Sequence, residues 1–423
     1  MTTPLLQRLV LATASLALVA LLGWSAWTLL RPLPTLDEID DLAQLGRTDE
    51  AIERVQSYVR SFPDHSEGRF RLAVLLIDRD EAAEQVDEAS AETALELLEP
   101  LQFENPRRMA LALLYQGKAL DRLLRHDEAE SVWKQALERD PQVPEAGWLL
   151  LQHYHRQRRI AEARELSLRL HHVEPNPVDR VRLLVELIRL DVHRLAPRGV
   201  IQWFDPVVER HPEDLRSRVT LGVALTREGL ADRGLSVLRE ALQDHPEDPL
   251  AWEGYLQGLE QAAQLAALVP TLDRLPAPLA DDPRFARFRG LAAVERQDFE
   301  AAAHAYQEAL AVDPDDPELI FQLARVLPMA GQPEEAEQYQ QRHQDYEEAR
   351  GELRRLYAVE VEPMARTPAI LNRPDLYRQI AELRERMGLR AEALAWHRLV
   401  LESRPEDPTS LAAIERLAGS PGS

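Results

Sequence analysis

The sequence contains no cysteine, and this absence removes several kinds of chemistry at once. Disulfide bonds, zinc–thiolate sites, iron–sulfur clusters, a thiol nucleophile and a lipid-modified N-terminal cysteine are all excluded. The absence of cysteine does not decide the cellular compartment, because an extracytoplasmic protein can simply lack disulfides. Aromatic residues make up only 6% of the chain, and the alternating Val, Ile and Thr runs that predict strands are nearly absent. The remaining composition, rich in Ala, Leu, Glu and Arg, favours helices.

Sequence motifs of common enzymes are also missing. The chain lacks G-x-x-x-x-G-K-[ST], G-x-G-x-x-G, G-x-S-x-G and H-E-x-x-H. Zinc ligands on one helix usually lie at positions i and i+4, which share a helix face. The two histidine pairs are closer in sequence than that: His153 with His155, and His171 with His172. No acidic residue has a telling spacing to them. The acidic turn 313–316 predicts helix capping, because the twelve-residue calcium pattern is absent. We therefore expect no catalytic residue, no metal site, no cofactor and no enzymatic activity.

Positive charge is scarce. The formal net charge is −22, and only two lysines occur, Lys118 and Lys134. Proteins that bind nucleic acid need a concentrated basic surface to neutralise phosphates. A nucleic acid partner is therefore not expected.

One long apolar segment lies near the N-terminus. The run 9–30 carries no charge, is flanked by Arg8 and Arg31, and has Trp24 and Trp27 near one end. A bilayer core of about 30 Å needs about 20 helical residues, and indole rings prefer the headgroup level. The alternative is a cleaved signal peptide with a cut before Ala26, but the apolar run is longer than the usual core of such peptides. The sequence predicts a short tail (1–8) and an uncleaved transmembrane helix (9–30).

The flanking charges favour one orientation of this predicted helix. Arg8 and the terminal amine lie on one side, and Arg31, followed by acidic residues, lies on the other. The positive-inside rule then places the N-terminus in the cytoplasm and the rest of the chain outside it, as in a single-pass protein of a bacterial-type inner membrane. The linker 31–35 contains two prolines, so it is short and stiff and keeps the following domain close to the membrane.

Prolines mark an internal repeat. They stand about 34 residues apart, with one longer first step and one doubled last step, at Pro63, Pro106, Pro141, Pro175, Pro212, Pro246 and Pro314. Twelve residues before each proline stands a small residue or, once, a valine: Ala51, Ala94, Ala129, Ala163, Val200, Gly234 and Ala302. Twelve residues before three of these small residues stands a glycine: Gly117, Gly222 or Gly290.

Close packing of two antiparallel helices explains this pattern. Small side chains allow the helix axes to approach, and large residues such as Trp133 and Tyr306 fill the next layer. Proline after the second helix ends it, and glycine between the two helices permits a positive φ. The expected turn residues are Gly46, Gly229, Gln297, Gly331 and Gly388.

This spacing resembles the tetratricopeptide repeat family. The clearest units are RFARFRGLAAVERQDFEAAAHAYQEALAVDPDDP (284–317), LLYQGKALDRLLRHDEAESVWKQALERDP (113–141) and LGVALTREGLADRGLSVLREALQDHPEDP (221–249). The resemblance covers roughly residues 36–417 and is weak over 180–212 and 250–280. It implies an all-α, right-handed superhelical solenoid of antiparallel helix pairs.

The resemblance also suggests a domain organisation. We expect about nine helix pairs over 36–341, one or two of them degenerate. An irregular joint follows at 342–373, where a charged helix gives way to a proline-rich stretch. A C-terminal pair with a capping helix occupies 374–417, because a solenoid must cover its last apolar face, and a disordered tail occupies 418–423.

In this family the first helix of each pair lines the concave face. Applied to this chain, that implies a groove containing Lys118, Trp148, Gln152, Arg156, Arg182, Arg189, Arg216, Arg227, Arg284 and Arg287. Arginine can hold a carboxylate through two parallel hydrogen bonds, so an acidic peptide or an exposed C-terminus is the implied ligand. The alternative is that these arginines pair with nearby Glu and Asp, as Arg156, Arg158 and Arg159 could with Glu162 and Glu165.

The function expected from this reading is a membrane-anchored scaffold or adaptor that holds a partner protein in its groove. Two alternatives stay open. One is a self-associating structural component of an envelope assembly, and the other is a non-catalytic accessory subunit of a membrane-associated enzyme or biogenesis complex. Fold alone does not decide among them, because solenoids serve many partners.

Overall fold

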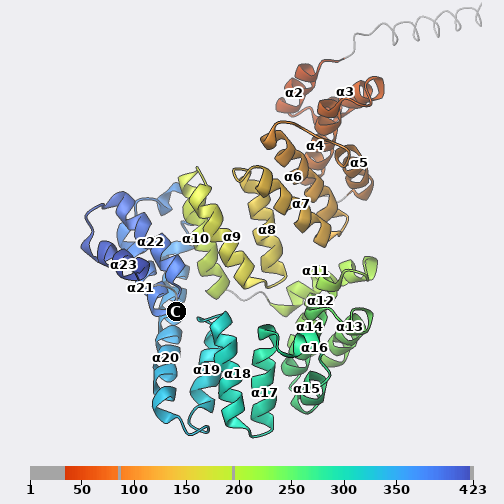
Figure 1. Ribbon diagram of the computed structural model, residues 1–423. Coiled ribbons are helices and arrows are strands. Elements are labelled where there is room, and N and C mark those ends of the chain that lie inside the picture. Colours follow the sequence, from red (N-terminus) through yellow and green to blue (C-terminus); the bar gives the residue numbers. More distant parts are fainter. Residues whose placement is uncertain (1–33, 84–86, 193–195, 420–423) are drawn as a thin grey trace, which may run out of the picture. The chain divides into compact units, whose positions relative to one another are not determined.

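The computed structural model describes residues 34–83, 87–192 and 196–419, and within these ranges it is built from helices without a strand (Figure 1). The tail 1–8 and the predicted transmembrane helix 9–30 lie outside the described residues. Among the helices that are described, none combines the length and the apolar composition needed to cross a bilayer.

The chain divides into two compact units, residues 1–104 and 105–423. The described helices of the first unit are α2 (Leu36–Gln44), α3 (Thr48–Ser61), α4 (Ser66–Ala82) and α5 (Glu88–Leu98). Helix α2 starts with a capping box, in which the Thr35 side chain accepts from the Glu38 amide and the Glu38 carboxylate accepts from the Thr35 amide. Ile39, Ala51, Val55 and Leu76 form the core of this unit.

The second unit contains a long succession of helices joined by short turns. Its described helices are α6 (Pro106–Arg122), α7 (His126–Arg139), α8 (Pro144–Arg156), α9 (Ile160–Val173), α10 (Pro177–Val192), α11 (Pro197–Arg210), α12 (Leu215–Arg227), α13 (Ala231–Asp244), α14 (Pro249–Gln261), α15 (Leu265–Leu272), α16 (Ala277–Ala280), α17 (Ala286–Glu295), α18 (Phe299–Val312), α19 (Pro317–Val326), α20 (Pro333–Leu356), α21 (Pro374–Arg386), α22 (Arg390–Ser403) and α23 (Pro408–Gly419).

Glycines on the first helix of a pair lie directly beneath a large side chain of the second. A Cβ on Gly117 would come within 2.2 Å of Trp133 Nε1, and a Cβ on Gly290 within 2.5 Å of the Tyr306 ring. Both distances are far below van der Waals contact, so neither position accepts a larger residue without movement. The predicted alternation of small and large residues between paired helices is confirmed at these positions.

Turns within the pairs use a left-handed residue, as expected. Gly46, Gly229, Gly331 and Gly388 have φ between 74° and 86°, and Gln297 has φ 61°. Other pairs place a residue with a side chain in the same conformation, at Leu124, Arg158 and Ala263. A side chain costs some strain in this conformation, and at Arg158 it places an arginine at the candidate site described below.

Helix α10 is apolar over most of its surface. Val181, Leu183, Leu184, Leu187 and Ile188 are each at most 1% exposed, whereas Arg182, Glu186 and Arg189 lie on its remaining, polar side. An apolar surface wider than one stripe must be covered on more than one side. Helix α9 covers one side of α10, and the C-terminal helices α20 and α22 cover another, so the end of the chain returns to α9 and α10 (Figure 1).

The weak repeat expected over 180–212 is therefore divided between two cores. Helix α10 belongs to the core shared with the C-terminal helices. Helix α11 instead packs through Val200, Phe204 and Val207 against α12 and against Leu124 in the turn between α6 and α7. The apolar surface of α10 accounts for this division. If α10 paired with α11 as a regular repeat, part of that apolar surface would be exposed to water.

The irregular segment near the C-terminus is shorter than the predicted joint 342–373. Helix α20 runs unbroken from Pro333 to Leu356 and so crosses the expected boundary at 341/342. A π-helical turn, Tyr357–Val361, and a 3₁₀ turn, Pro368–Ile370, follow before α21. Tyr357, Val361 and Ile370 are buried in the α10 core, and the Tyr377 hydroxyl donates to the Ile370 carbonyl at 2.6 Å. This segment is a packed part of the core.

A buried group of four charges joins α9 and α10 to the C-terminal helices. Arg164 and Arg384 each pair with both Asp191 and Glu392, and the Arg384 side chain is fully buried. Burial acts to raise the pKa of Asp191, but the guanidinium groups of Arg384 and Arg164 outweigh it and lower that pKa. The stability contributed by Asp191 is thus complete above the unfolded-state pKa of about 3.9. It is lost as the pH falls through the lowered folded-state pKa.

The close helix approach gives a first prediction. A Cβ on Gly234 would lie 2.7 Å from the Gly222 carbonyl oxygen, a backbone atom that cannot move aside cheaply. Gly234→Ala should lower the free energy of unfolding by about 1–3 kcal/mol. Gly351 on α20 has no atom within 4 Å of its added Cβ, so Gly351→Ala should raise stability by about 1 kcal/mol. Urea unfolding followed by circular dichroism measures both, and equal effects of the two changes would contradict the assigned packing.

The buried charges give a second prediction. Arg384→Gln leaves Asp191 and Glu392 short of a buried partner and should destabilise the protein by about 3–5 kcal/mol. The control is Arg296→Gln, since Arg296 pairs with Asp273 in an exposed position and the change should cost about 1 kcal/mol or less. Thermal unfolding midpoints that fall equally in both variants would show that the buried network does not hold the C-terminal helices.

Candidate functional site

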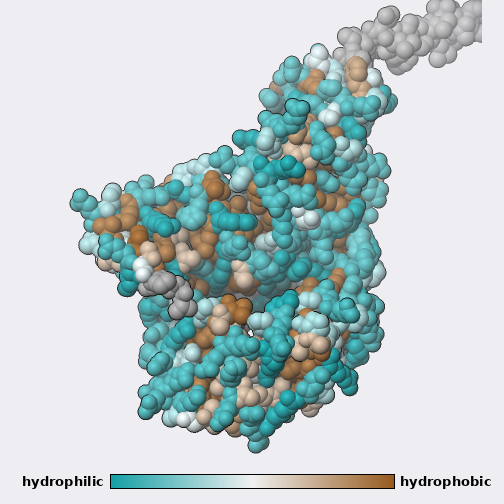
Figure 2. Space-filling view, in the orientation of Figure 1, coloured by the Kyte–Doolittle hydropathy of each residue, from teal (hydrophilic) through white to brown (hydrophobic). Residues whose placement is uncertain are grey.

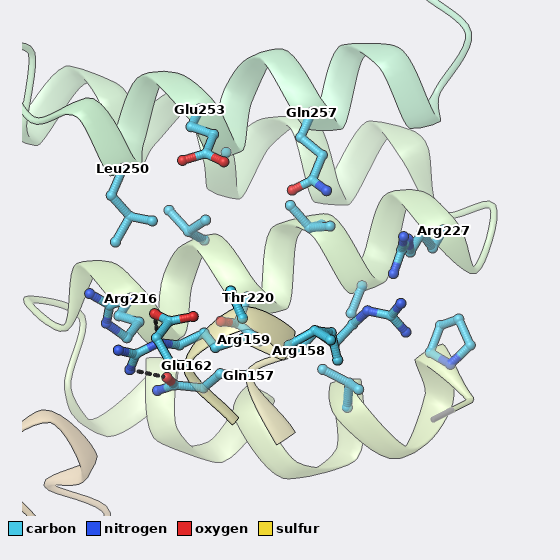
Figure 3. Close-up of a pocket in the computed structure, with 18 residues that line it drawn as sticks. Gln157, Arg158, Arg159, Glu162, Arg216, Thr220, Arg227, Leu250, Glu253 and Gln257 are labelled. Atoms are coloured by element: carbon cyan, nitrogen blue, oxygen red, sulfur yellow. Dashed lines mark hydrogen bonds and ion pairs between the residues drawn. The ribbon is translucent and has the colours of Figure 1, made fainter. Parts of the chain in front are cut away.

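A cavity lined by four arginines lies within the second unit, between the α8–α9 turn and helices α12 and α14 (Figure 3). We call it the arginine cavity. Its volume is about 420 Å³, which is within the range of ligand-binding cavities. Its lining residues are Gln157, Arg158, Arg159, Ile160, Ala161, Glu162, Pro197, Val200, Arg216, Val219, Thr220, Val223, Ala224, Arg227, Leu250, Glu253, Gly254 and Gln257.

Helices α12 and α14 each supply one face of the arginine cavity. On α12, Arg216, Thr220, Val223 and Arg227 follow one another at three- or four-residue spacing and therefore share a side of the helix. Arg216 and Arg227 lie at opposite ends of the cavity, and Glu253 and Gln257 of α14 point towards it (Figure 3). The cavity thus combines cations at its ends with apolar side chains between them.

The turn between α8 and α9 supplies the third wall. Arg158 takes the left-handed position of this turn, and its amide donates to the His155 carbonyl at 3.1 Å. Arg159 is held firmly: its guanidinium donates to Glu162 at 2.7 Å and to Glu130 at 2.5 Å, and it lies 4.4 Å from the Tyr154 ring centre. Arg159 therefore shapes the cavity, because its own hydrogen bonds are directed into the protein.

The charge in the cavity is mainly positive, although the chain as a whole is acidic. Four arginines line it against two glutamates. Burial raises the pKa of Glu253, against the opposing effect of Arg287 and Arg284, so its charged form is disfavoured there. Arg216 has Asp127 at 3.9 Å, and burial together with Asp214 raises the pKa of Asp127 to about 7. Arg216 is therefore only partly neutralised at neutral pH.

A second, smaller cavity lies between α8 and α10, and we call it the Trp148 cavity. Its volume is about 140 Å³, enough for one side chain, and it is lined by Trp148, Leu151, Gln152, His155, Ala163, Ser167, Arg182, Glu186, Arg189, Leu190 and Arg366. The guanidinium of Arg182 stacks on the Trp148 ring at 4.2 Å. The Nε atoms of Arg182 and Arg189 are buried and have no hydrogen-bond acceptor among the residues described here. An unpaired buried donor is costly, so these groups favour an anionic ligand.

His155 belongs to the same cavity. Burial, together with the charges of Arg189 and Arg158, lowers its pKa to about 4. The imidazole is therefore neutral near pH 7, and its Nδ1 can accept from Arg189 Nη2, which lies 3.1 Å away. Arg189 also pairs with Glu186 at 2.7 Å.

The ten groove residues predicted from the sequence are not gathered in one cavity. Trp148, Gln152, Arg182 and Arg189 meet in the Trp148 cavity, and Arg216 and Arg227 lie in the arginine cavity.

The other four predicted groove residues line neither cavity. Arg156 stacks on Trp203 at 3.7 Å, and Lys118 is buried with its Nζ 2.5 Å from Glu145. Arg284 pairs with Asp282 at 2.5 Å, and Arg287 pairs with Glu260. Intramolecular pairing, the alternative considered from the sequence, therefore holds for three of these four residues.

Several lining residues were missed by sequence reasoning. Arg158 and Arg159 lie in a turn rather than on the helix face that the repeat pattern identifies. Glu253 and Gln257 lie on α14, in the stretch 250–280 where the repeat is weak. The three-residue and four-residue spacing of polar positions on α14 was the available signal, but spacing alone does not show which groove a helix faces.

Comparison with known proteins identifies the repeats. Models described as tetratricopeptide repeat match residues 36–95, 114–171 and 293–359. No curated protein matches the sequence.

The solved structures that match this chain include the following three. MamA 41-end from Desulfovibrio magneticus RS-1 is 19% identical, with 40% of this chain and 97% of that chain covered and a TM-score of 0.30. A tetratricopeptide repeat protein from Parabacteroides merdae ATCC 43184 is 17% identical, with coverages of 60% and 98% and a TM-score of 0.32. The C-terminal part of a TPR repeat-containing protein from Cytophaga hutchinsonii is 16% identical, with coverages of 68% and 99% and a TM-score of 0.30.

Paired helices, small residues at their contacts and the matching family models agree with one another. Residues 36–95, 114–171 and 293–359 therefore contain tetratricopeptide repeats, which generally mediate protein–protein interaction.

Proposed function

We propose that this chain is a non-enzymatic scaffold that binds a short acidic and partly apolar segment of another protein in the arginine cavity. The observation that carries the proposal is the meeting of four arginines with apolar side chains in one cavity of about 420 Å³. A peptide with carboxylates at either end of an apolar residue matches this arrangement. Arg216 and Arg227 would bind the carboxylates, and Val219, Val223 and Leu250 would contact the apolar side chain.

The Trp148 cavity is the second part of the proposed site. Its volume suits a single carboxylate side chain or a chain terminus, and the buried Nε donors of Arg182 and Arg189 supply the hydrogen bonds. Helix α9 contributes residues to both cavities, and the arginine cavity also takes residues from the turn that joins α8 to α9. One extended segment crossing this hairpin could thus contact both.

Surface hydropathy supports a polar recognition mode. The face in Figure 2 is mostly hydrophilic, with apolar residues in separate patches. The exposed large apolar residues include Phe62, Leu230, Val312 and Leu411, which lie in or beside four different helices. A large continuous apolar patch would have favoured association through a flat surface.

A peptide-binding prediction tests the cavity by charge. The probe is a fluorescent peptide of alternating Glu and Leu, compared with its Gln/Leu analogue by fluorescence anisotropy on the full chain. Arg216→Gln with Arg227→Gln should weaken binding of the Glu peptide by about tenfold or more, because hydrogen bonds to charged groups contribute about 1.5–3 kcal/mol each. Glu253→Gln should strengthen it by removing a repelling carboxylate.

The opposite response of the two cavity variants separates recognition from general damage to the fold. Arg296→Gln, which changes an exposed arginine outside both cavities, is the control and should leave affinity unchanged. Equal binding of the Glu and Gln peptides, or weaker binding in Glu253→Gln, would refute charge-based recognition. A photo-crosslinking residue at Gln257 in native membranes then identifies the partner, and recovery of this chain alone would indicate self-association instead.

We also propose that residues 9–30 anchor the chain in a bacterial-type inner membrane, with the N-terminus in the cytoplasm and the repeats outside. The support is the uncharged run 9–30 between Arg8 and Arg31. Since the chain has no cysteine, single-cysteine variants report topology directly. A membrane-impermeant maleimide should label Gln56→Cys in cells with a permeable outer layer, whereas Thr2→Cys should react only after the inner membrane is opened. The reverse pattern would invert the topology, and release of the chain by carbonate washing would refute the anchor.

A further inference from the structure

Two histidines and an aspartate meet beneath α11, outside both cavities. Asp121 lies near the end of α6, His126 is the first residue of α7, and His153 is on α8. One possible ligand atom from each residue lies within 4.8 Å of the other two. His126 is 1% exposed and His153 is 2% exposed. No acidic residue has a telling sequence spacing to His153, but packing of the α6–α7 pair on α8 brings Asp121 close to it.

The buried ring nitrogens of this cluster are incompletely used. His126 Nδ1 is 2.9 Å from Asp121 Oδ1, which accounts for one of its two nitrogens. His126 Nε2 is buried and has no hydrogen-bond partner in the described part of the chain. His153 Nε2 is also buried, and its neighbour is Glu130 Oε2 at 3.3 Å. A buried polar atom without a partner is costly, so a ligand that binds His126 Nε2 would be stabilised here.

The walls around the cluster are aromatic. Trp203 of α11 stacks on the His126 ring with centroids 6.1 Å apart, and Phe204 meets the same ring edge-on at 6.2 Å. Trp133 meets the His153 ring edge-on at 6.3 Å. An apolar surround of this kind limits access of water and strengthens electrostatic interactions inside it.

Charges near the cluster act in both directions. Glu130 adds a second carboxylate, but it also binds Arg159 at 2.5 Å and Lys134 at 2.6 Å. The guanidinium of Arg156, which stacks on Trp203, acts on Asp121 and opposes another cation. The charges around the cluster do not attract a cation on balance. A cation would therefore be held by direct bonds to Asp121, His126 and His153.

We propose that Asp121, His126 and His153 form a binding site for a divalent transition metal, with Zn²⁺ as the best match. Two imidazole nitrogens and one carboxylate oxygen are donors that Zn²⁺ commonly accepts from proteins, with a fourth position left to water or a further ligand. The metal would fasten the α6–α7 pair to α8 beneath α11. Since Pro197 and Val200 of α11 line the arginine cavity, binding would also steady one wall of that cavity.

Metal titration of the full chain tests this assignment. After removal of metals with a chelator, Zn²⁺ binding is measured by calorimetry, and Co²⁺ is added as a spectroscopic probe of nitrogen and oxygen ligands. The wild type should bind one Zn²⁺ per chain. His153→Gln and Asp121→Asn should each weaken binding by about tenfold or more, a loss seen even for outer partners of metal ligands. His155→Gln, two residues further along α8 and in the Trp148 cavity, should bind Zn²⁺ as the wild type does.

A second readout covers the chance that a buried substitution disturbs folding. Asp121→Asn keeps the size of the side chain and an acceptor for His126, and circular dichroism checks its helix content. Zn²⁺ should raise the thermal unfolding midpoint of the wild type and of His155→Gln, but not that of Asp121→Asn or His153→Gln, because a ligand stabilises only the state that binds it. Absence of Zn²⁺ binding by the wild type, or unchanged binding in the folded Asp121→Asn variant, would overturn the proposal.

Discussion

Burial of the wide apolar surface of α10 is the constraint on which the second unit depends. A regular helix pair has one apolar side and leaves the other to solvent or to a partner, whereas α10 presents Leu183, Leu184 and Val185 in succession. The C-terminal helices cover what α9 does not. That contact also buries charges, so Arg164 and Arg384 must pair with Asp191 and Glu392. The closure of the C-terminal helices onto α9 and α10 therefore depends on specific ion pairs as well as on apolar packing.

This closure determines where a ligand could bind. With α10 committed to the C-terminal helices, α11 packs on α12 and on the α6–α7 turn. Helices α12 and α14 consequently face the α8–α9 turn, and the arginine cavity lies between them. Its walls come from parts of the chain that are distant in sequence. A cavity of this kind differs from a continuous groove lined by successive repeats, and in the proposed function it binds a short segment of a partner.

Charge in this protein is organised mainly by pairing. Most of the arginines at which the repeat pattern points have a carboxylate nearby, as Arg284 has Asp282 and Arg287 has Glu260. Exposed pairs of this kind contribute little to stability. Arg182 and Arg189 at the Trp148 cavity differ, because their Nε atoms are buried and have no acceptor among the described residues. The same reasoning applies to the buried Nε2 of His126.

Local and periodic features were determined by the sequence alone: helix pairs, the Gly117–Trp133 contact and the left-handed turns such as Gly229. These follow from side-chain size and backbone sterics within about 34 residues, the length of one repeat. Only the tertiary structure decided that the Arg158 turn faces α12 and that Asp121 and His126 meet His153. Such contacts join residues whose separation follows no repeat period. They arise because apolar surfaces far apart in the chain, those of α10 and α11 above all, must be covered together.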